Sequence, residues 1–224
     1  SHVLKRAKMD QNVLDFGFGS GFLSKMLSLK FEKIQGLEIN DMSKMIEYTE
    51  NKERQKVFYK AIEDKKKIWE WILSKHKNII FSFYDGEKIP FEDGYFDAIC
   101  AYAVIEHLPL NSAEKVVREL SRVTKIGGKI FIAKLPQALS ITEFLASILK
   151  IGRHDKLFSK KEIINLLSEN GWKVESVCFS DFIFEFPPNI TNKLFYLLKI
   201  INKIAMKTPL KFLSHNLVVV AIKK

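Results

Sequence analysis

The stretch that decides the fold is residues 13–23, Val-Leu-Asp-Phe-Gly-Phe-Gly-Ser-Gly-Phe-Leu. A short apolar run ends in an acid, three glycines follow at alternate positions, and a helix-like pattern then resumes. This order predicts a strand, a tight turn and a helix, because glycine lets the backbone bend sharply and leaves its N–H groups uncovered. Those N–H groups and the positive end of the helix would hold an anionic group such as a carboxylate. A dinucleotide is disfavoured, because its pyrophosphate pattern needs glycine where this chain has Phe22.

A second acid stands at the end of the next apolar run, residues 34–38. Glu38 lies about twenty residues past the glycines, and a carboxylate at this place can accept two hydrogen bonds from a ribose diol. The alternative is an ordinary solvated acid at a strand end. After the glycine turn, the ribose interpretation is the favoured one.

Further motifs follow in order along the chain. Residues 84–99 run Tyr-Asp-Gly-Glu-Lys-Ile-Pro-Phe-Glu-Asp-Gly-Tyr-Phe-Asp-Ala-Ile, residues 103–109 run Ala-Val-Ile-Glu-His-Leu-Pro, and a glycine pair stands at 127–128. With these motifs the sequence resembles the class I S-adenosylmethionine-dependent methyltransferases, most closely their type 11 small-molecule branch. The resemblance covers roughly residues 12–133 and, more weakly, 157–177. It implies S-adenosyl-L-methionine as the cofactor and S-adenosyl-L-homocysteine as the product.

The resemblance also implies roles for the first motif. Asp15 would brace the glycine turn and approach the amino group of the methionine moiety. Gly17 and Gly19 would bring the backbone close to the cofactor, and Gly21 would open the helix. Phe16 and Phe18 are bulkier than is usual beside these glycines, which should not abolish binding.

The same resemblance places the nucleoside end of the cofactor. Glu38 would take the ribose hydroxyls, although Asp is commoner there, and Ile39 would flank the adenine. Asp85 would accept a hydrogen bond from the adenine amino group, with the Gly86 N–H near the ring. The Asp-Gly pair also has a simpler interpretation, since it is a favourable turn sequence.

The reacting end is less well defined. By the resemblance, Ala101 and Tyr102 would border the methyl-bearing end of the cofactor. His107 is the candidate general base, because histidine titrates near neutral pH, but it could equally be a structural residue. Methyl transfer needs a base only where the acceptor must lose a proton. No group of Cys and His residues has the spacing of a metal site.

Composition is that of a soluble globular protein, with 47% hydrophobic and 28% charged residues. The two cysteines, Cys100 and Cys178, cannot form a disulfide framework and fit a reducing compartment, so we expect a cytoplasmic protein, with membrane association open. Both lie in apolar runs, which predicts that both are buried. The formal charge of +10 is compatible with nucleic acid, anionic lipid or an acidic substrate, or is a lysine-rich composition without a partner.

Alternating strand and helix patterns predict an α/β fold. We expect one domain over residues 1–224, with a Rossmann-like, seven-stranded, mostly parallel sheet, helices on both faces and an antiparallel last strand. The strands are expected at 12–16, 33–38, 78–83, 96–101, 129–133, 172–179 and 216–222. The sequence Ser-Lys-Lys-Glu at 159–162 is a capping box that opens a helix. Another helix is expected over 112–123, and the glycine pair at 127–128 is expected to end its tail.

Two insertions exceed what the resembled family needs. Residues 51–78 mix nine basic residues with Phe58, Tyr59, Trp69 and Trp71. Such a mixture can bind single-stranded nucleic acid, but the favoured interpretation is a pair of amphipathic helices with the aromatics packed on the sheet. Residues 181–213 hold an amphipathic helix expected at 192–207, with a lysine stripe. This helix could lie on an anionic membrane, close the substrate pocket as a lid, or pack on the core.

We therefore predict methyl transfer to a small-molecule or lipid-linked acceptor by in-line displacement. Two alternatives stay open at this stage. One is an RNA methyltransferase that uses the basic insertion, and the other is a non-catalytic module that only binds S-adenosylmethionine.

Overall fold

A computed structural model describes residues 11–39, 52–108, 110–149, 156–182 and 188–224. The side chains of 52–59, 61–62, 110–111, 149 and 188–195 lie outside this description. Phe58 and Tyr59 of the basic insertion are therefore not placed. Among the described residues, no helix is both long and apolar enough to cross a bilayer.

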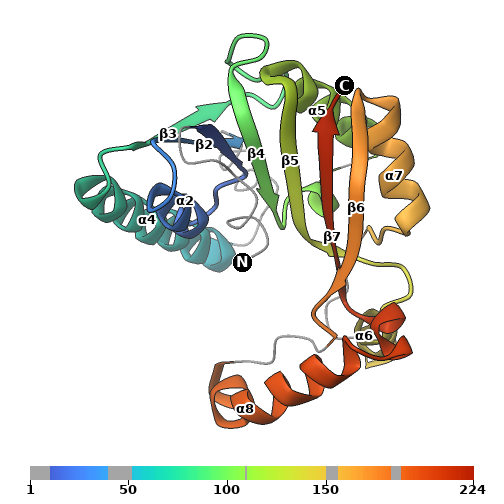
Figure 1. Cartoon of the computed structure of the whole chain (residues 1–224). Helices are drawn as coiled ribbons and strands as arrows, with labels where there is room; N and C mark the ends of the chain where they lie inside the picture. The colour runs from blue at the N-terminus through green and yellow to red at the C-terminus, as the bar shows by residue number, and fades with distance from the viewer. Residues whose placement is uncertain (1–10, 40–51, 109, 150–155, 183–187) are drawn as a thin grey trace. The chain divides into compact units, whose positions relative to one another are not determined.

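The strands form one seven-stranded sheet in the order β3-β2-β1-β4-β5-β7-β6 (Figure 1). β1 is parallel to β2 and to β4, β2 is parallel to β3, and β7 runs antiparallel to β6. The predicted fold class, including the antiparallel last strand, is confirmed. The strands are β1 (Asn12–Phe16), β2 (Lys33–Ile39), β3 (Ile79–Tyr84), β4 (Phe96–Tyr102), β5 (Thr124–Pro136), β6 (Trp172–Ser180) and β7 (Asn216–Lys223).

The helices follow the alternation expected from the sequence. They are α2 (Phe22–Ser28), α4 (Lys52–Lys75), α5 (Leu110–Val123), α6 (Ile141–Leu149), α7 (Lys160–Glu169) and α8 (Pro188–Ala205), with short 3₁₀ helices η1 (Ile105–His107) and η2 (Pro209–Leu213). At the start of α7, Ser159 Oγ accepts a hydrogen bond from the Glu162 N–H, and the Glu162 carboxylate accepts one from the Ser159 N–H. The predicted capping box is confirmed.

The chain divides into two compact units, each described here by itself. The first comprises Ser1–Ala101 and Glu119–Lys129, and the second comprises Tyr102–Arg118 and Ile130–Lys224. The first unit is built around the buried side chains of β1, β2 and β4, such as Leu14, Ile34 and Ile99. In the second, Trp172 is fully buried and its indole N–H donates to the Val117 carbonyl oxygen at 3.2 Å.

Three local predictions are wrong. The basic insertion forms the single 24-residue helix α4 rather than a helical pair, since nothing within Lys52–Lys75 breaks the helix. The glycine pair at 127–128 lies inside β5 and does not end α5, because β5 begins at Thr124, directly after the helix. Cys178 is exposed, because it lies on the edge strand β6, whose residue alternation is shifted by a bulge at 174–176. Cys100 is buried as expected.

Candidate functional site

The glycine turn follows β1 directly and has the conformation that its sequence predicts. Gly17, Gly19 and Gly21 all have positive φ angles, of 71°, 52° and 79°, where any other residue is strained. The Gly17 N–H donates to the Leu37 carbonyl oxygen of β2 at 2.8 Å, which ties the turn to the neighbouring strand. At Gly21 a side chain would also lack space, because a Cβ would lie 2.7 Å from the Phe81 ring.

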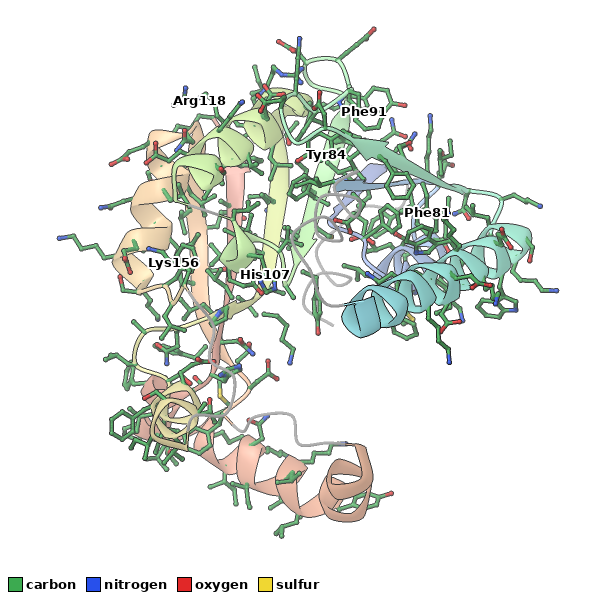
Figure 2. All side chains as sticks on the ribbon, turned by 180° about the vertical axis from the view of Figure 1, so that it is seen from behind. Phe81, Tyr84, Phe91, His107, Arg118 and Lys156 are labelled. Atoms are coloured by element: carbon green, nitrogen blue, oxygen red, sulfur yellow. The ribbon has the colours of Figure 1, made fainter. Side chains whose placement is uncertain are left out.

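The two aromatic residues on either side of Gly17 point into the protein. Phe16 is 1% exposed and Phe18 is 4% exposed. Phe18 stacks on Phe81 with ring centroids 4.2 Å apart and contacts Trp69 edge-on at 5.4 Å. Figure 2 labels Phe81 on β3, whose ring contacts those of both Phe18 and Trp69. The bulk of these side chains is therefore part of the core of the first unit.

Both backbone polar groups of Gly19 are held by hydrogen bonds. Its N–H donates to Glu38 Oε2 at 2.9 Å, and its carbonyl oxygen accepts a hydrogen bond from Trp69 Nε1 at 3.0 Å. Trp69 comes from α4 and Glu38 from the end of β2. The insertion therefore contributes directly to the geometry of the glycine turn.

Asp15 lies beneath the turn and is 1% exposed. Its Oδ2 accepts a hydrogen bond from Ser24 Oγ of α2 at 2.5 Å. Burial raises the pKa of the Asp15 carboxyl to about 7, and the charge of Glu38 adds to this, while the Ser24 hydrogen bond opposes it. The group can therefore gain or lose a proton near neutral pH.

The Asp85-Gly86 turn directly follows β3. Asp85 is exposed, and its Oδ1 accepts a hydrogen bond from the Glu87 N–H at 2.8 Å, which closes an Asx turn. Gly86 has a φ of 84°, and the Ile39 side chain lies 3.9 Å from where its Cβ would be. Glu38, Ile39 and the Asp85-Gly86 turn are thus neighbours in the first unit, since β2 and β3 pair up to Ile39 and Tyr84.

Tyr84, just before this turn, is buried, and its hydroxyl has no hydrogen-bond partner among the described residues. Figure 2 labels its side chain on β3. Burial raises the pKa of this hydroxyl, and the nearby charges of Glu38 and Asp85 act in the same direction. The hydroxyl is therefore neutral at physiological pH and can donate a hydrogen bond.

Arg122 fixes the segment that follows the Asp85 turn. Its guanidinium donates to the carbonyl oxygens of Ile89 and Phe91 at 2.8 and 2.9 Å, and it pairs with Asp93 and Glu119. This arginine and its acidic partners hold residues 89–93 to the end of α5.

The predicted residues of the reacting end fall in both units. Ala101 is buried at the end of β4, opposite Phe16 in the β1 register, and belongs to the first unit. Tyr102 is half-exposed and belongs to the second unit, as does His107 in η1. The His107 side chain is 67% exposed, with its Nε2 3.9 Å from Glu106 Oε1. The other predicted residues, from Asp15 to Gly86, all lie in the first unit.

Sequence reasoning missed three residues of this site, namely Ser24, Trp69 and Phe81. Ser24 stands three positions after Gly21, which is the spacing that turns a helix residue back toward β1, so a signal for it existed. The pairing of Trp69 with Gly19 spans fifty residues, and no local pattern reveals it. Among the described residues no group of His, Cys, Asp and Glu could hold a metal ion.

Residues 14–132, a little over half of the chain, match the family model described as "Methyltransferase domain". The chain belongs to this methyltransferase family. The family is one of S-adenosylmethionine-dependent methyltransferases, and the chain carries its methyltransferase domain. The resemblance inferred from the glycine turn and the later motifs is thereby confirmed.

A curated relative of this methyltransferase is the mitochondrial ubiquinone biosynthesis O-methyltransferase of Dictyostelium discoideum. The two are 27% identical over 173 residues, which is 73% of this chain and 50% of the relative. The chain therefore spans about half the length of that protein.

Solved structures share the fold. An S-adenosylmethionine-dependent methyltransferase from Methanosarcina mazei has a TM-score of 0.65 at 16% identity and covers 99% of this chain and 96% of its own. One from Aquifex aeolicus has a TM-score of 0.59 at 19% identity, covering 100% and 88%. At these identities the likeness concerns the fold alone.

Proposed function

We propose that this methyltransferase transfers the methyl group of S-adenosylmethionine to a small-molecule acceptor, a class that includes lipid-linked molecules. The observation that supports the proposal most is the geometry of the turn at Gly19. The Gly19 N–H donates to Glu38, its carbonyl oxygen accepts from Trp69, and Asp15 is buried beneath the turn. When bound, the cofactor supplies a methyl group that its positive sulfur has already activated.

The acceptor groups of the site suit an adenosine with a charged amino acid tail. Each Glu38 oxygen accepts one backbone N–H, from Gly19 and from Ile39, so each keeps a lone pair for a ribose hydroxyl. Asp85 Oδ2 remains for the adenine amino group, because the turn hydrogen bond is made by Oδ1. Asp15 would balance the positive amino group of the methionine moiety, either directly or through the turn that it supports.

Positioning supplies much of the rate in a displacement of this kind. The residues of the first unit would therefore act by fixing the cofactor, with Ala101 and Tyr102 at its methyl-bearing end. His107 is our candidate base for acceptors that must lose a proton.

Two observations favour a small acceptor over RNA. The relative from Dictyostelium is named as an O-methyltransferase of ubiquinone biosynthesis. In addition, the described part of α4 mixes acids with its lysines, as in the Glu63–Lys67 pair at 2.9 Å, whereas a nucleic-acid track is expected to be uniformly basic. Of the insertion's two tryptophans, Trp69 is buried and Trp71 lies under the Lys25 ammonium, 4.5 Å from its ring centroid.

The proposal is tested by incubating the protein with cofactor carrying a labelled methyl group and fractionated cell extract. We expect label in the organic-soluble, low-molecular-weight fraction. Label in the RNA fraction would instead support the RNA alternative. Micromolar cofactor binding without transfer to any fraction would support the non-catalytic alternative, and both outcomes contradict our proposal.

A further inference from the structure

Three segments of the second unit carry their apolar residues on the outside. Figure 1 places α6, α8 and η2 together beyond the ends of β6 and β7. In α6, Phe144 and Ile148 are 63% and 59% exposed. In α8, Tyr196, Ile200 and Ile204 recur at a spacing of four and are 79%, 56% and 59% exposed. These residues, together with Leu210 and Phe212 of η2, are called the outer surface.

One polar residue on each of the two helices, Glu143 and Asn202, points inward. Glu143 of α6 is 4% exposed and lies 3.6 Å from His215 Nδ1, which also contacts Thr142 Oγ1 at 2.8 Å. On α8, Asn202 Oδ1 accepts a hydrogen bond from the Phe182 N–H at 2.6 Å, and Ala205 is buried. The inner face of α8 is therefore already occupied, and its apolar face is the one turned away from the protein.

Helices that expose their apolar residues to solvent have few physical explanations. A contiguous exposed apolar patch marks a surface that a protein partner or a membrane covers. The arrangement in α6, with a buried acid and an exposed phenylalanine on adjacent positions, is the reverse of a helix that packs on a core. The core-packed interpretation of this insertion does not account for it.

The charges around the outer surface indicate which kind of partner covers it. Lys203 of α8, Lys207 of the turn after it and Lys211 of η2 are exposed. No Asp or Glu occurs anywhere from residue 186 to residue 224. Lysines beside an apolar helix face are typical of helices that lie in the plane of an anionic bilayer, with the ammonium groups at the phosphates and the apolar side chains below them.

We propose that the outer surface of α6, α8 and η2 docks this protein on an anionic lipid bilayer, with α8 lying in the interface plane. Apolar insertion and attraction of the lysines to the negative leaflet act together, so neither alone is sufficient. The proposal concerns the second unit and does not depend on methyl transfer. Docking on a bilayer would also bring the enzyme close to acceptors that are linked to lipids.

The test is co-sedimentation of the full chain with vesicles in 0.15 M salt. One set contains phosphatidylserine in phosphatidylcholine, and the other is phosphatidylcholine alone. We expect binding to the anionic vesicles that is at least tenfold stronger than to the neutral ones. The double variant Ile200→Asn/Ile204→Asn and the triple variant Lys203→Glu/Lys207→Glu/Lys211→Glu should each lose at least tenfold in anionic-vesicle binding.

The matched control is Lys60→Glu/Lys66→Glu/Lys75→Glu, which makes the same change in charge on exposed positions of α4. This control should retain vesicle binding, and circular dichroism and cofactor binding should show that every variant is folded. The proposal is overturned if the parent protein does not bind anionic vesicles. It is also overturned if the α4 control loses binding as completely as the isoleucine and lysine variants. It is also overturned if Ile200→Asn/Ile204→Asn only dissolves a dimer seen by sedimentation velocity, because a second copy would then cover the surface. Vesicle binding without cofactor binding would count against the proposed function alone.

Discussion

The indole N–H of Trp69 donates to the carbonyl oxygen of Gly19 at 3.0 Å, across fifty residues of sequence. This bond joins the α4 insertion to the turn on which the cofactor site is built. The Gly19 N–H donates to Glu38, so the orientation of Gly19 depends on one contact from β2 and one from α4.

Replacing Trp69 by Phe should weaken cofactor binding several-fold. The substitution keeps an aromatic ring in the cluster with Phe18, but it removes the hydrogen bond, which contributes about 1 kcal/mol net, together with part of the buried ring volume. Titration calorimetry with S-adenosylhomocysteine measures the effect. Trp71→Phe on the exposed side of α4 is the matched control and should bind as the parent does. Equal affinities of the two variants would show that Trp69 does not position the turn.

Glu38→Ala and Asp85→Ala should each reduce cofactor affinity at least tenfold. Either change removes a carboxylate that we assign to the ribose or the adenine, and hydrogen bonds to a charged group contribute about 1.5–3 kcal/mol each. Binding isotherms provide the measurement, with Glu32→Ala, an exposed acid just before β2, as the control. Parent-like affinity in both site variants would refute the assignment of the nucleoside end.

Asp15 should make the stability of the cofactor-free protein depend on pH. Its pKa is raised from 3.8 to about 7 by burial, so the native protein keeps a proton that the unfolded chain releases. Between about pH 4 and 7 the native state then binds more protons, and the free energy of unfolding falls as the pH rises. Urea unfolding at pH 5 and pH 8 should show a loss of a few kcal/mol at most.

Asp15→Asn should flatten that part of the profile, because an amide cannot ionise. Asp64→Asn on the exposed face of α4 should keep the parental slope. A parental slope in Asp15→Asn as well would mean that another group is responsible for the pH dependence.

Gly21→Ala should destabilise the protein more than Gly127→Ala. The two glycines have nearly the same φ, 79° and 78°, but a Cβ at Gly21 would lie 2.7 Å from the Phe81 ring, whereas nothing lies within 4 Å at Gly127. Both variants incur about 1 kcal/mol of backbone strain, and the first adds about 1–3 kcal/mol of overpacking. Denaturant unfolding compares them, and Phe81→Leu should partly rescue only Gly21→Ala. Equal losses without rescue would contradict the crowding seen at Phe81.

Much of the first unit could be predicted from sequence because its signals are local. The glycines at 17, 19 and 21 require positive φ angles that only a particular turn provides, and Glu38 ends an apolar run that could only be a strand. The resemblance implied that Ile39 and Gly86 lie at the same end of the cofactor, and the two are neighbours in the structure. In contrast, Trp69 and Trp71 stand two positions apart in one helix, and nothing local tells which is buried against Gly19.

The second unit was less predictable for a different reason. Periodicity predicts that α8 has an apolar face, but it does not say whether that face meets the core or points outward. The exposed position of Cys178 likewise depends on β6 being an edge strand with a bulge, which is a property of the assembled sheet.

Because Trp69 is hydrogen-bonded to Gly19, its fluorescence can report on ligand binding at the glycine turn. The chain has only two other tryptophans, of which Trp172 is fully buried in the second unit and Trp71 is half in water. In a Trp71→Phe background, a change in indole emission when ligand is added would come mainly from the residue that touches the turn. Occupancy of the enzyme could then be followed in real time without a dye or an isotope.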